Sequence, residues 1–506
     1  MSKTSNNNSI FKVIAASSVG TLIEWYDFYI FGSLAFIISG KFFPQDNPTA
    51  AFLSTLATFA AGFVVRPFGA LVFGRLGDLI GRKYTFMLTL LLMGGATFLI
   101  GCVPSYDTIG YWAPFLVLVL RLLQGLALGG EYGGAATYVA EHAPANRRGY
   151  YTSWIQTTAT AGLFISLMVI LITKSTLSAD AFDAWGWRVP FWVSVIMVFV
   201  SYIIRQKMHE SPLFAKAKAE GKIVKNPLKE SFGNKYNLKF VLLALFGAVM
   251  GQGVIWYTGQ FYAMNFIQKV CNVNSIQTDS LVAIALLMAT PFFVVFGGLS
   301  DKIGRKSIML AGMLLAVLTY RPIYKNIFEI TDIAAKTELA DKRTVTNRLE
   351  NKEDKTIIHY QFLSYYEDGT IATKDSVVTI NTVNKAETVK TGYSIQLDSG
   401  NKWKLIWLVF IQVIYVTMVY GPIAAFLVEM FPVNIRYTSM SLPYHVGNGI
   451  FGGLLPMVAT YLVTKAQTSG SPDWYLNGLW YPIIIAGISF VIGLVYLSRK
   501  NRQVHD

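Results

Sequence analysis

Long apolar stretches separated by short polar turns recur along this chain and limit what it can fold into. A helix needs about 20 apolar residues to cross the hydrocarbon core of a bilayer. About twelve stretches are long enough, near residues 13–39, 52–74, 84–103, 112–140, 152–173, 187–204, 240–267, 279–299, 307–324, 403–428, 438–464 and 476–498. Hydrophobic residues make up 53% of the chain, more than a soluble domain of this length needs. The sequence therefore predicts an all-α membrane protein with about twelve transmembrane helices.

The net charge of +14 is distributed unevenly among the turns. Lys and Arg gather in alternate loops, near 75–83, 147–148, 205–239, 302–306 and 499–502, whereas the intervening short loops carry only an occasional Lys. Positive residues favour the cytoplasmic side of a membrane protein. We therefore expect both termini and these loops in the cytoplasm, and we interpret the charge as topology rather than nucleic-acid binding. The polar run from Glu24 to Asp27 argues against a cleavable signal peptide, so the pattern suits a bacterial inner membrane.

A short charged turn occurs twice and indicates two equivalent halves. GRLGDLIGRK occupies 74–83 and GGLSDKIGRK occupies 297–306, so the two copies lie 223 residues apart (297 minus 74). A second signature, Glu-x-x-Pro-x-Asn-x-Arg, starts at Glu141 and at Glu429, which lie 288 residues apart (429 minus 141). The difference between 288 and 223 places an insertion of 65 residues between the second turn and Glu429.

These offsets predict how the chain is divided. We expect an N-terminal six-helix bundle at 1–204, a cytoplasmic linker with a short surface helix at 205–239, spans seven to nine at 240–324, the insertion at 325–402, and the last three spans with a cytoplasmic tail at 403–506. The insertion alternates polar and apolar residues at 359–365 and then reads Asp368-Gly369, a hairpin signal. We predict a small β-rich extracytoplasmic module, which is either a spacer or a site for an unknown partner or glycan.

The two charged turns resemble the signature of the major facilitator superfamily, which lies between spans two and three and again between spans eight and nine. Finer features resemble its metabolite:proton symporter family, and they lie at 24–29, 66–69, 121–125, 129–134, 186–192 and 421–438. That family includes transporters for α-ketoglutarate, citrate, proline/betaine and shikimate. The resemblance covers all but the tails and the insertion. It implies a major-facilitator-type bundle of two pseudo-equivalent six-helix halves that alternates access between the two sides of the membrane.

Five ionisable residues lie inside the predicted spans of the first half: Glu24, Asp27, Arg66, Arg121 and Glu131. A charge within a membrane usually faces a cavity or a partner. Asp27 and Glu131, followed by Glu24, are candidates for proton coupling, because burial and a neighbouring Arg tune the proton affinity of a carboxylate. Arg66 and Arg121 are candidates for holding a substrate carboxylate through paired hydrogen bonds. The alternative is a static set of ion pairs that holds this half together.

Polar and aromatic residues are candidates for the rest of a substrate site between the two halves. They are Trp154 and Gln156 in span five, Trp256, Tyr257 and Gln260 in span seven, Tyr420 in span ten, and Tyr444, His445 and Asn448 in span eleven. Each aromatic residue alone is more often a packing residue or an interface anchor. His445 is either a proton group or a hydrogen-bonded histidine at a helix interface.

The resemblance implies that the repeated signatures form a cytoplasmic gate, which holds the halves together when the cavity opens outward. The gate residues are Gly74, Asp78, Gly81, Arg82, Glu141 and Arg148 in the first half, with Asp301, Gly304, Arg305, Glu429 and Arg436 in the second.

The sequence therefore predicts a secondary transporter that imports a small carboxylate-bearing metabolite together with protons. A uniporter or an exchanger is the main alternative, and a membrane sensor that uses the insertion is a weaker one from another class. We expect neither an enzyme nor a cofactor or metal site, because no nucleophile–base arrangement stands out and Cys102 and Cys271 form no ligand cluster. The expected partners are the substrate, protons and the lipid bilayer.

Overall fold

The computed structural model of the protein describes residues 3–207, 209–222, 224–352, 355–381 and 387–497. Within these ranges, 11 helical segments are long and apolar enough to cross a membrane: Ala57–Leu79, Arg82–Cys102, Trp112–His142, Ala145–Thr176, Gly186–Gln206, Lys235–Val270, Ser275–Ile303, Arg305–Thr331, Ser399–Met430, Arg436–Thr468 and Trp474–Tyr496. The first expected span corresponds to α1 (Lys3–Ser33) and α2 (Ala35–Phe42). The basic residues expected at 499–502 lie outside the described part of the chain.

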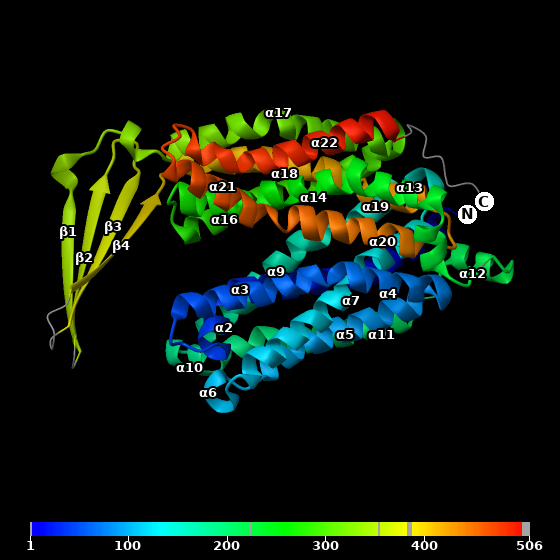
Figure 1. The fold of residues 1–506 in the computed structure, drawn as a ribbon, viewed down its shortest axis with the longest axis horizontal. Helices are drawn as coiled ribbons and strands as arrows, with labels where there is room; N and C mark the ends of the chain where they lie inside the picture. Colours follow the sequence, from blue (N-terminus) through cyan, green and yellow to red (C-terminus); the bar gives the residue numbers. More distant parts are fainter. Residues whose placement is uncertain (1–2, 208, 223, 353–354, 382–386, 498–506) are drawn as a thin grey trace.

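The first half is a helical bundle drawn in blue to teal in Figure 1. Its helices are α1, α2, α3 (Pro48–Val64), α4 (Arg66–Leu79), α5 (Arg82–Cys102), α6 (Tyr106–Ile109), α7 (Trp112–His142), α8 (Arg148–Ser153), α9 (Thr158–Thr176), α10 (Ala179–Ala184) and α11 (Val189–Gln206). α1 lies inside this bundle, where Ile23, Tyr26 and Ile30 are completely buried. Glycine lets the helices approach closely, since a Cβ on Gly125 of α7 would lie 2.1 Å from the Gly62 carbonyl oxygen of α3.

The second half runs from green to red in Figure 1 and repeats this arrangement. Its helices are α13 (Lys235–Ala244), α14 (Met250–Tyr257), α15 (Ala263–Asn265), α16 (Ser275–Ile303), α17 (Arg305–Thr331), α18 (Ser399–Tyr420), α19 (Ile423–Met430), α20 (Arg436–Val446), α21 (Leu455–Thr468) and α22 (Trp480–Tyr496). π-helical turns at Leu245–Val249, Thr258–Tyr262 and Phe266–Val270 interrupt the helix that includes α14, and another follows α20 at Gly447–Gly452. Such turns are frequent at functional sites.

The linker between the halves contains α12 (Pro212–Ala219). We predicted a surface helix in this region, and the structure shows that α12 also packs against the first half. Phe214 is 1% exposed, and the guanidinium carbon of Arg82 lies 4.4 Å from the centre of its ring. Glu210, just before α12, accepts hydrogen bonds from the backbone N–H groups of Arg82 and Lys83 at 3.1 and 3.4 Å. The linker therefore covers the start of α5.

The insertion is a four-stranded antiparallel sheet in the order β1–β2–β3–β4. Its strands are β1 (Thr344–Lys352), β2 (Lys355–Tyr365), β3 (Ile371–Asn381) and β4 (Glu387–Gln396). The predicted β-rich character and the turn at Asp368-Gly369 are both confirmed. α17 continues past the predicted span end at 324 to Thr331 before the chain reaches the sheet. In Figure 1 the sheet stands at the end of the bundle opposite the two chain termini, with β4 nearest the helices.

Hydrogen bonds fix the β2–β3 turn. Gly369 has φ 83°, a left-handed conformation that glycine adopts without strain. Burial alone would raise the pKa of the Asp368 carboxyl, but hydrogen bonds from Lys336 and Thr370 outweigh it and lower that pKa to about 2. Lys336 Nζ lies 2.6 Å from Asp368 Oδ2, and Asn401 Nδ2 donates to the same oxygen at 2.8 Å. The turn is thus tied to both chain segments that join the insertion to the helices.

Backbone pairing also connects the sheet to the helical bundle. Asn274 N donates to Ile395 O at 2.8 Å, and Ile395 N donates to Asn272 O at 2.7 Å. Gln277 at the start of α16 exchanges two hydrogen bonds of 2.8 Å with the backbone of Leu397. β4 therefore adds onto the loop between the seventh and eighth predicted spans.

Candidate functional site

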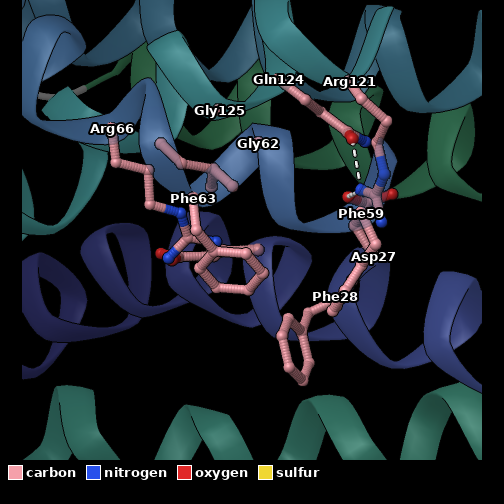
Figure 2. A pocket seen from close by; sticks show the side chains of 11 residues that line it. Asp27, Phe28, Phe59, Gly62, Phe63, Arg66, Arg121, Gln124 and Gly125 are labelled. Carbon is pink, nitrogen blue, oxygen red and sulfur yellow. Dashed lines mark hydrogen bonds and ion pairs between the residues drawn. The ribbon is translucent and has the colours of Figure 1, made fainter. Parts of the chain in front are cut away.

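Two ion pairs lie on α1 in the middle of the first half. Arg66 Nη1 of α4 lies 3.4 Å from Glu24 Oε1, and Arg121 Nη1 of α7 lies 3.4 Å from Asp27 Oδ2. Both arginine side chains point toward α1 in Figure 2. The structure therefore brings four of the five predicted ionisable residues to one place.

The two arginines are incompletely satisfied. Among the described residues, Nε of Arg66 and both Nε and Nη2 of Arg121 have no hydrogen-bond partner. Aromatic rings form the surroundings, because the Arg121 guanidinium lies 3.6 Å from the centre of Phe31 and that of Arg66 lies 4.4 Å from the centre of Phe63. Buried guanidinium N–H groups without partners are costly, so this geometry favours an anionic or polar ligand beside them.

Gln124 and Thr97 hold Arg121 in place. Arg121 Nη1 donates to Gln124 Oε1 at 2.5 Å, and Gln124 Nε2 donates in turn to Thr97 Oγ1 at 2.6 Å. Neither residue was among the predicted site residues. Gln124 lies one helical turn after Arg121, and this three-residue spacing was the available signal.

A cavity between the halves borders the same site. It is lined by Glu24, Trp25, Phe63 and Arg66 of the first half and by Trp256, Tyr257, Tyr420, Tyr444, His445, Asn448 and Gly449 of the second. A neighbouring cavity is lined by both ion pairs, Phe28, Phe59 and Gln124. Their volumes of about 30 and 10 Å³ leave room for one or two water molecules. The site is therefore closed around its side chains in this conformation.

Aromatic contacts and polar bonds form the wall of this cavity. The rings of Trp25 and Trp256 lie 5.0 Å apart across the two halves, and Tyr132 stacks on Tyr444 at 3.8 Å. Tyr444 Oη lies 2.7 Å from Tyr420 Oη. Six of the nine predicted polar and aromatic candidates therefore line the cavity, namely Trp256, Tyr257, Tyr420, Tyr444, His445 and Asn448.

The second half supplies further polar groups. Gln252 Nε2 and Asn448 Oδ1 lie 3.1 Å apart, and the reverse pair of amide atoms also lies 3.1 Å apart. His445 is 2% exposed, and its Nε2 has no hydrogen-bond partner among the described residues. Asn448 lies in the π-helical turn that follows α20, so the irregular backbone is part of this wall.

Three other predicted candidates lie elsewhere. Trp154 packs against Phe11 and Tyr150, with ring centres 6.4 and 6.2 Å away. Gln156 donates to Tyr132 Oη at 2.7 Å and so supports the cavity wall from behind. Gln260 is buried but lines neither cavity. Trp154 and Gln260 therefore line neither of these two cavities, and their place in the substrate site stays a prediction.

Glu131 also lies away from this site. It pairs with Arg205, whose Nη2 lies 2.5 Å from Glu131 Oε1, and it accepts a hydrogen bond from Thr89 at 2.8 Å. Both partners of the pair are completely buried. We expected Arg205 at the start of the cytoplasmic linker, but it lies in the last turn of α11, where its side chain is completely buried.

The repeated signatures meet across the halves in a reciprocal way. Asp78 at the end of α4 accepts hydrogen bonds from Thr438 N at 2.8 Å and Tyr437 N at 3.4 Å, two amides in the first turn of α20. Asp301 near the end of α16 accepts from Gly149 N at 2.9 Å and Tyr150 N at 2.8 Å in α8. Each aspartate therefore caps a helix of the opposite half, where the helix dipole favours a negative charge. We call these two contacts the Asp78 latch and the Asp301 latch.

Arginines and glutamates support both latches. Arg82 Nη1 lies 2.9 Å from Asp78, and Arg305 Nη1 lies 2.6 Å from Asp301. Glu141 lies 3.0 Å from Arg436 of the other half and also accepts a hydrogen bond from Ser211 of the linker. Glu429 lies 3.0 Å from Arg305 within its own half. Arg148 instead donates to Ala140 O at 3.2 Å.

Backbone angles and close packing favour glycine at several positions of the repeated turns. Gly81 and Gly304, which precede α5 and α17, have φ of 124° and 97°. A Cβ on Gly74 would lie 3.0 Å from Thr438 Cα, and one on Gly77 would lie 2.1 Å from the Tyr437 ring. Close contact between α4 and α20 therefore requires glycine at these positions.

No metal centre is evident in the part of the chain that the structure describes, because no three His, Cys, Asp or Glu side chains there are grouped to hold an ion. The arrangement consists instead of a polar cavity between two helical halves and a closed charged junction at one end.

Comparison with known proteins identifies this arrangement. A family model described as sugar (and other) transporter matches residues 12–225. The inner membrane metabolite transport protein YhjE of Escherichia coli strain K12 is 32% identical over 98% of this chain and 96% of its own length. The α-ketoglutarate permease of the same strain is 28% identical over 99% of this chain and 96% of its own. For the citrate-proton symporter of Klebsiella pneumoniae, the identity is 29% over 95% and 90%.

Solved structures share the fold. The proton:xylose symporter XylE bound to 6-bromo-6-deoxy-D-glucose aligns with a TM-score of 0.67 over 97% of this chain and 95% of its own, at 15% identity. The outward conformation of the transporter FucP aligns with a TM-score of 0.55 at 12% identity. The sequence relatives and the two-half fold agree. The chain is a multi-pass membrane transporter that belongs to the major facilitator superfamily, in its metabolite:proton symporter family.

Proposed function

We propose that this protein imports a small carboxylate-bearing metabolite with protons across a bacterial inner membrane by alternating access. The observation that carries the proposal is the pair of loose ion pairs, Glu24–Arg66 and Asp27–Arg121, beside a cavity between the halves. A cation that is held by a carboxylate and still has free N–H groups can exchange its partner for a substrate anion.

The two arginines would have different roles. Arg66 lines both cavities and faces the second half, so it is the residue proposed to bind the substrate carboxylate. Arg121 lines only the cavity within the first half and is held by Gln124 and Asp27. Asp27 is the proposed proton acceptor, since protonation would neutralise one partner of a buried pair and release Arg121. Glu24 would give up Arg66 when substrate arrives.

The relatives support the coupling and the substrate class. The matched curated proteins include a citrate-proton symporter and an α-ketoglutarate permease, both named for carboxylates. They also include a proline/betaine transporter, which makes a zwitterion the main competing substrate. We also propose that the end with both termini faces the cytoplasm, because the junction of α4 and α5, which includes Arg75, Arg82 and Lys83, lies at that end in Figure 1.

Uptake into liposomes that contain the purified protein tests this proposal. An imposed inward proton gradient should drive accumulation of a dicarboxylate or keto acid, and collapse of the gradient should abolish it. Asp27→Asn should lose gradient-driven accumulation while retaining exchange of labelled for unlabelled substrate. Accumulation that ignores the gradient would refute symport and favour a uniporter or an exchanger.

A second test addresses the proposed role of Arg66 in binding the substrate anion, with Arg75 as the control position. Arg66→Lys should raise the KM for the anion at least about tenfold, because an ammonium group cannot form the paired hydrogen bonds of a guanidinium. Arg75→Lys on the same helix should leave the KM unchanged, since Arg75 is exposed. An unchanged KM in Arg66→Lys would move the anion site elsewhere.

A further inference from the structure

The sheet of the insertion has one apolar face without a covering layer. The strand register places Leu349, Ile358, Val378 and Val389 in one row across all four strands. Two residues along, the row of Asn347, Tyr360, Ser376 and Thr391 belongs to the same face, because side chains alternate along a strand. We call this side the apolar face. The opposite side, called the polar face, carries Arg348, His359 and Val377 in its neighbouring row.

The apolar face is exposed. Leu349, Val389, Val345 and Tyr393 are 60%, 58%, 55% and 39% exposed, and the register puts all four on this face. A sheet with one apolar side normally packs that side against another layer. Among the described residues, the helices meet this face only at the end of β4, where Tyr393 and Ile395 line a cavity together with Val463 and Gln467 of α21. The strands run across the long axis of the bundle, so the rest of the face lies beyond the helices in Figure 1.

The size of this face suits a protein interface. Strands of about ten residues at 3.3 Å per residue, spaced about 4.8 Å apart, give about 600 Å² per face and about 1,200 Å² for two faces together. Stable interfaces begin at about that area. Away from the strand ends, Lys374 is the one charged residue that the described strands place on this face.

We propose that the apolar face binds the same face of a second copy of this chain, so that the two sheets form a β-sandwich outside the bilayer. Identical faces match each other in size and in low charge. The strands are stacked along the bundle axis, so both faces look sideways, toward neighbours in the membrane. A twofold rotation about the membrane normal then brings two apolar faces together while both bundles keep their orientation. Face-to-face sheets pack about 10 Å apart.

Neighbouring residues of the same type provide a matched test. Ile358 lies on the apolar face and Ile357 on the polar face, and the same holds for Val378 and Val377. The mass of the full chain, purified in discs of its native lipids, should correspond to two copies. Ile358→Lys should reduce the dimer fraction at least tenfold, whereas Ile357→Lys should leave it unchanged. Monomers in the parent chain, or equal loss in both variants, would overturn the proposal.

Cross-linking in intact membranes gives a second readout that does not depend on purification. In a chain with Cys102→Ser and Cys271→Ser, Ser376→Cys places one thiol in the middle of the apolar face, and Thr379→Cys places one on the polar face. Oxidation should form a disulfide-linked dimer from Ser376→Cys and not from Thr379→Cys. Equal cross-linking of both would indicate random collision, and none from Ser376→Cys would indicate another occupant of the face. Either result contradicts the proposal.

Discussion

Arg205 and Glu131 form a completely buried ion pair inside the first half. Their side chains are completely buried, and Arg205 Nη1 also donates to Phe86 O at 2.5 Å. Thr89 supplies a further hydrogen bond to Glu131. A pair enclosed in this way is held by several bonds, in contrast to the two loose pairs at the cavity, and we interpret it as a structural support.

Removing one partner of this pair should destabilise the protein strongly. Arg205→Met leaves the Glu131 carboxylate buried without its cation, which costs about 3–5 kcal/mol. The double variant Glu131→Gln with Arg205→Met removes both charges and should recover most of that loss. Thermal unfolding in lipid discs measures the effect, with Arg75→Met at an exposed position as the control. A double variant as unstable as Arg205→Met would show that charge pairing is not the cause.

For single residues, the sequence predicted which charged side chains lie inside the helices better than it predicted their partners. Glu24 and Asp27 were predicted inside the first span, and both pair with arginines of other helices. The Glu131 partner was missed because Arg205 lies at the start of a basic run, where composition indicates solvent. Only the packing of α11 against α5 shows that this side chain turns inward.

α4 and α20 can cross at close distance because Gly77 has no side chain. A Cβ on Gly77 would lie 2.1 Å from the Tyr437 ring, and Tyr437 Oη donates a hydrogen bond to Gly130 O of α7. The Tyr437 ring cannot move away from Gly77 without losing its hydrogen bond to Gly130. The contact between α4 and α20 therefore has little room to adjust.

Gly77→Ala should therefore force α4 and α20 apart and disfavour the closed junction. Overpacking of this kind costs about 1–3 kcal/mol, so we expect uptake to fall roughly tenfold or more. Initial uptake rates in proteoliposomes measure it. Gly95→Ala on α5 is the control, because a Cβ there meets nothing within 4 Å. Equal rates in the two variants would show that the crossing is not rigid.

In the insertion, the sequence predicted the local elements but not the long-range contacts between them. Alternating residues and Asp368-Gly369 predicted strands and a turn, because both signals are local. The pairing of β4 with the loop at Asn272 and Asn274 was not predicted, since it joins residues more than a hundred positions apart. The exposure of the apolar face was not predicted either, because the alternation of residues along a strand does not show whether a second layer covers the sheet.

At the scale of the whole molecule, the junction between the halves is closed by two latches, and each half supplies the aspartate of one of them. Each uses one aspartate against two backbone N–H groups, and the two are related by the internal repeat. Hydrogen bonds to a charged group contribute about 1.5–3 kcal/mol each. The closed junction is therefore held firmly but reversibly, as alternating access requires.

Weakening the latches should open the junction in steps. Asp78→Asn and Asp301→Asn should each raise the open population about tenfold, and the double variant should approach the product if the latches act separately. The reporter is maleimide labelling of Thr137→Cys in a chain without native cysteines, because Thr137 is completely buried and contacts Met440 across the junction. Labelling rates equal to those of the parent in both single variants would contradict the latch assignment.

The repeat spacing predicted the internal symmetry and the place of the insertion, and the fold confirms both. Comparison of the two offsets was sufficient because duplication preserves order along the chain. Which motif of one half touches which motif of the other was not predicted. Contacts such as Asp301 with Gly149 depend on how the halves dock, and local sequence does not encode that.

The donors in both latches are main-chain amides, so hydrogen exchange at these amides can report on opening of the junction. Gly149, Tyr150, Tyr437 and Thr438 hold their amide protons against a carboxylate while the junction is closed. Those protons meet solvent only when the halves part. The rate at which deuterium replaces them therefore reports how often the junction opens, without an attached label or a substitution. The amides of α8 report on the Asp301 latch, and those of α20 report on the Asp78 latch.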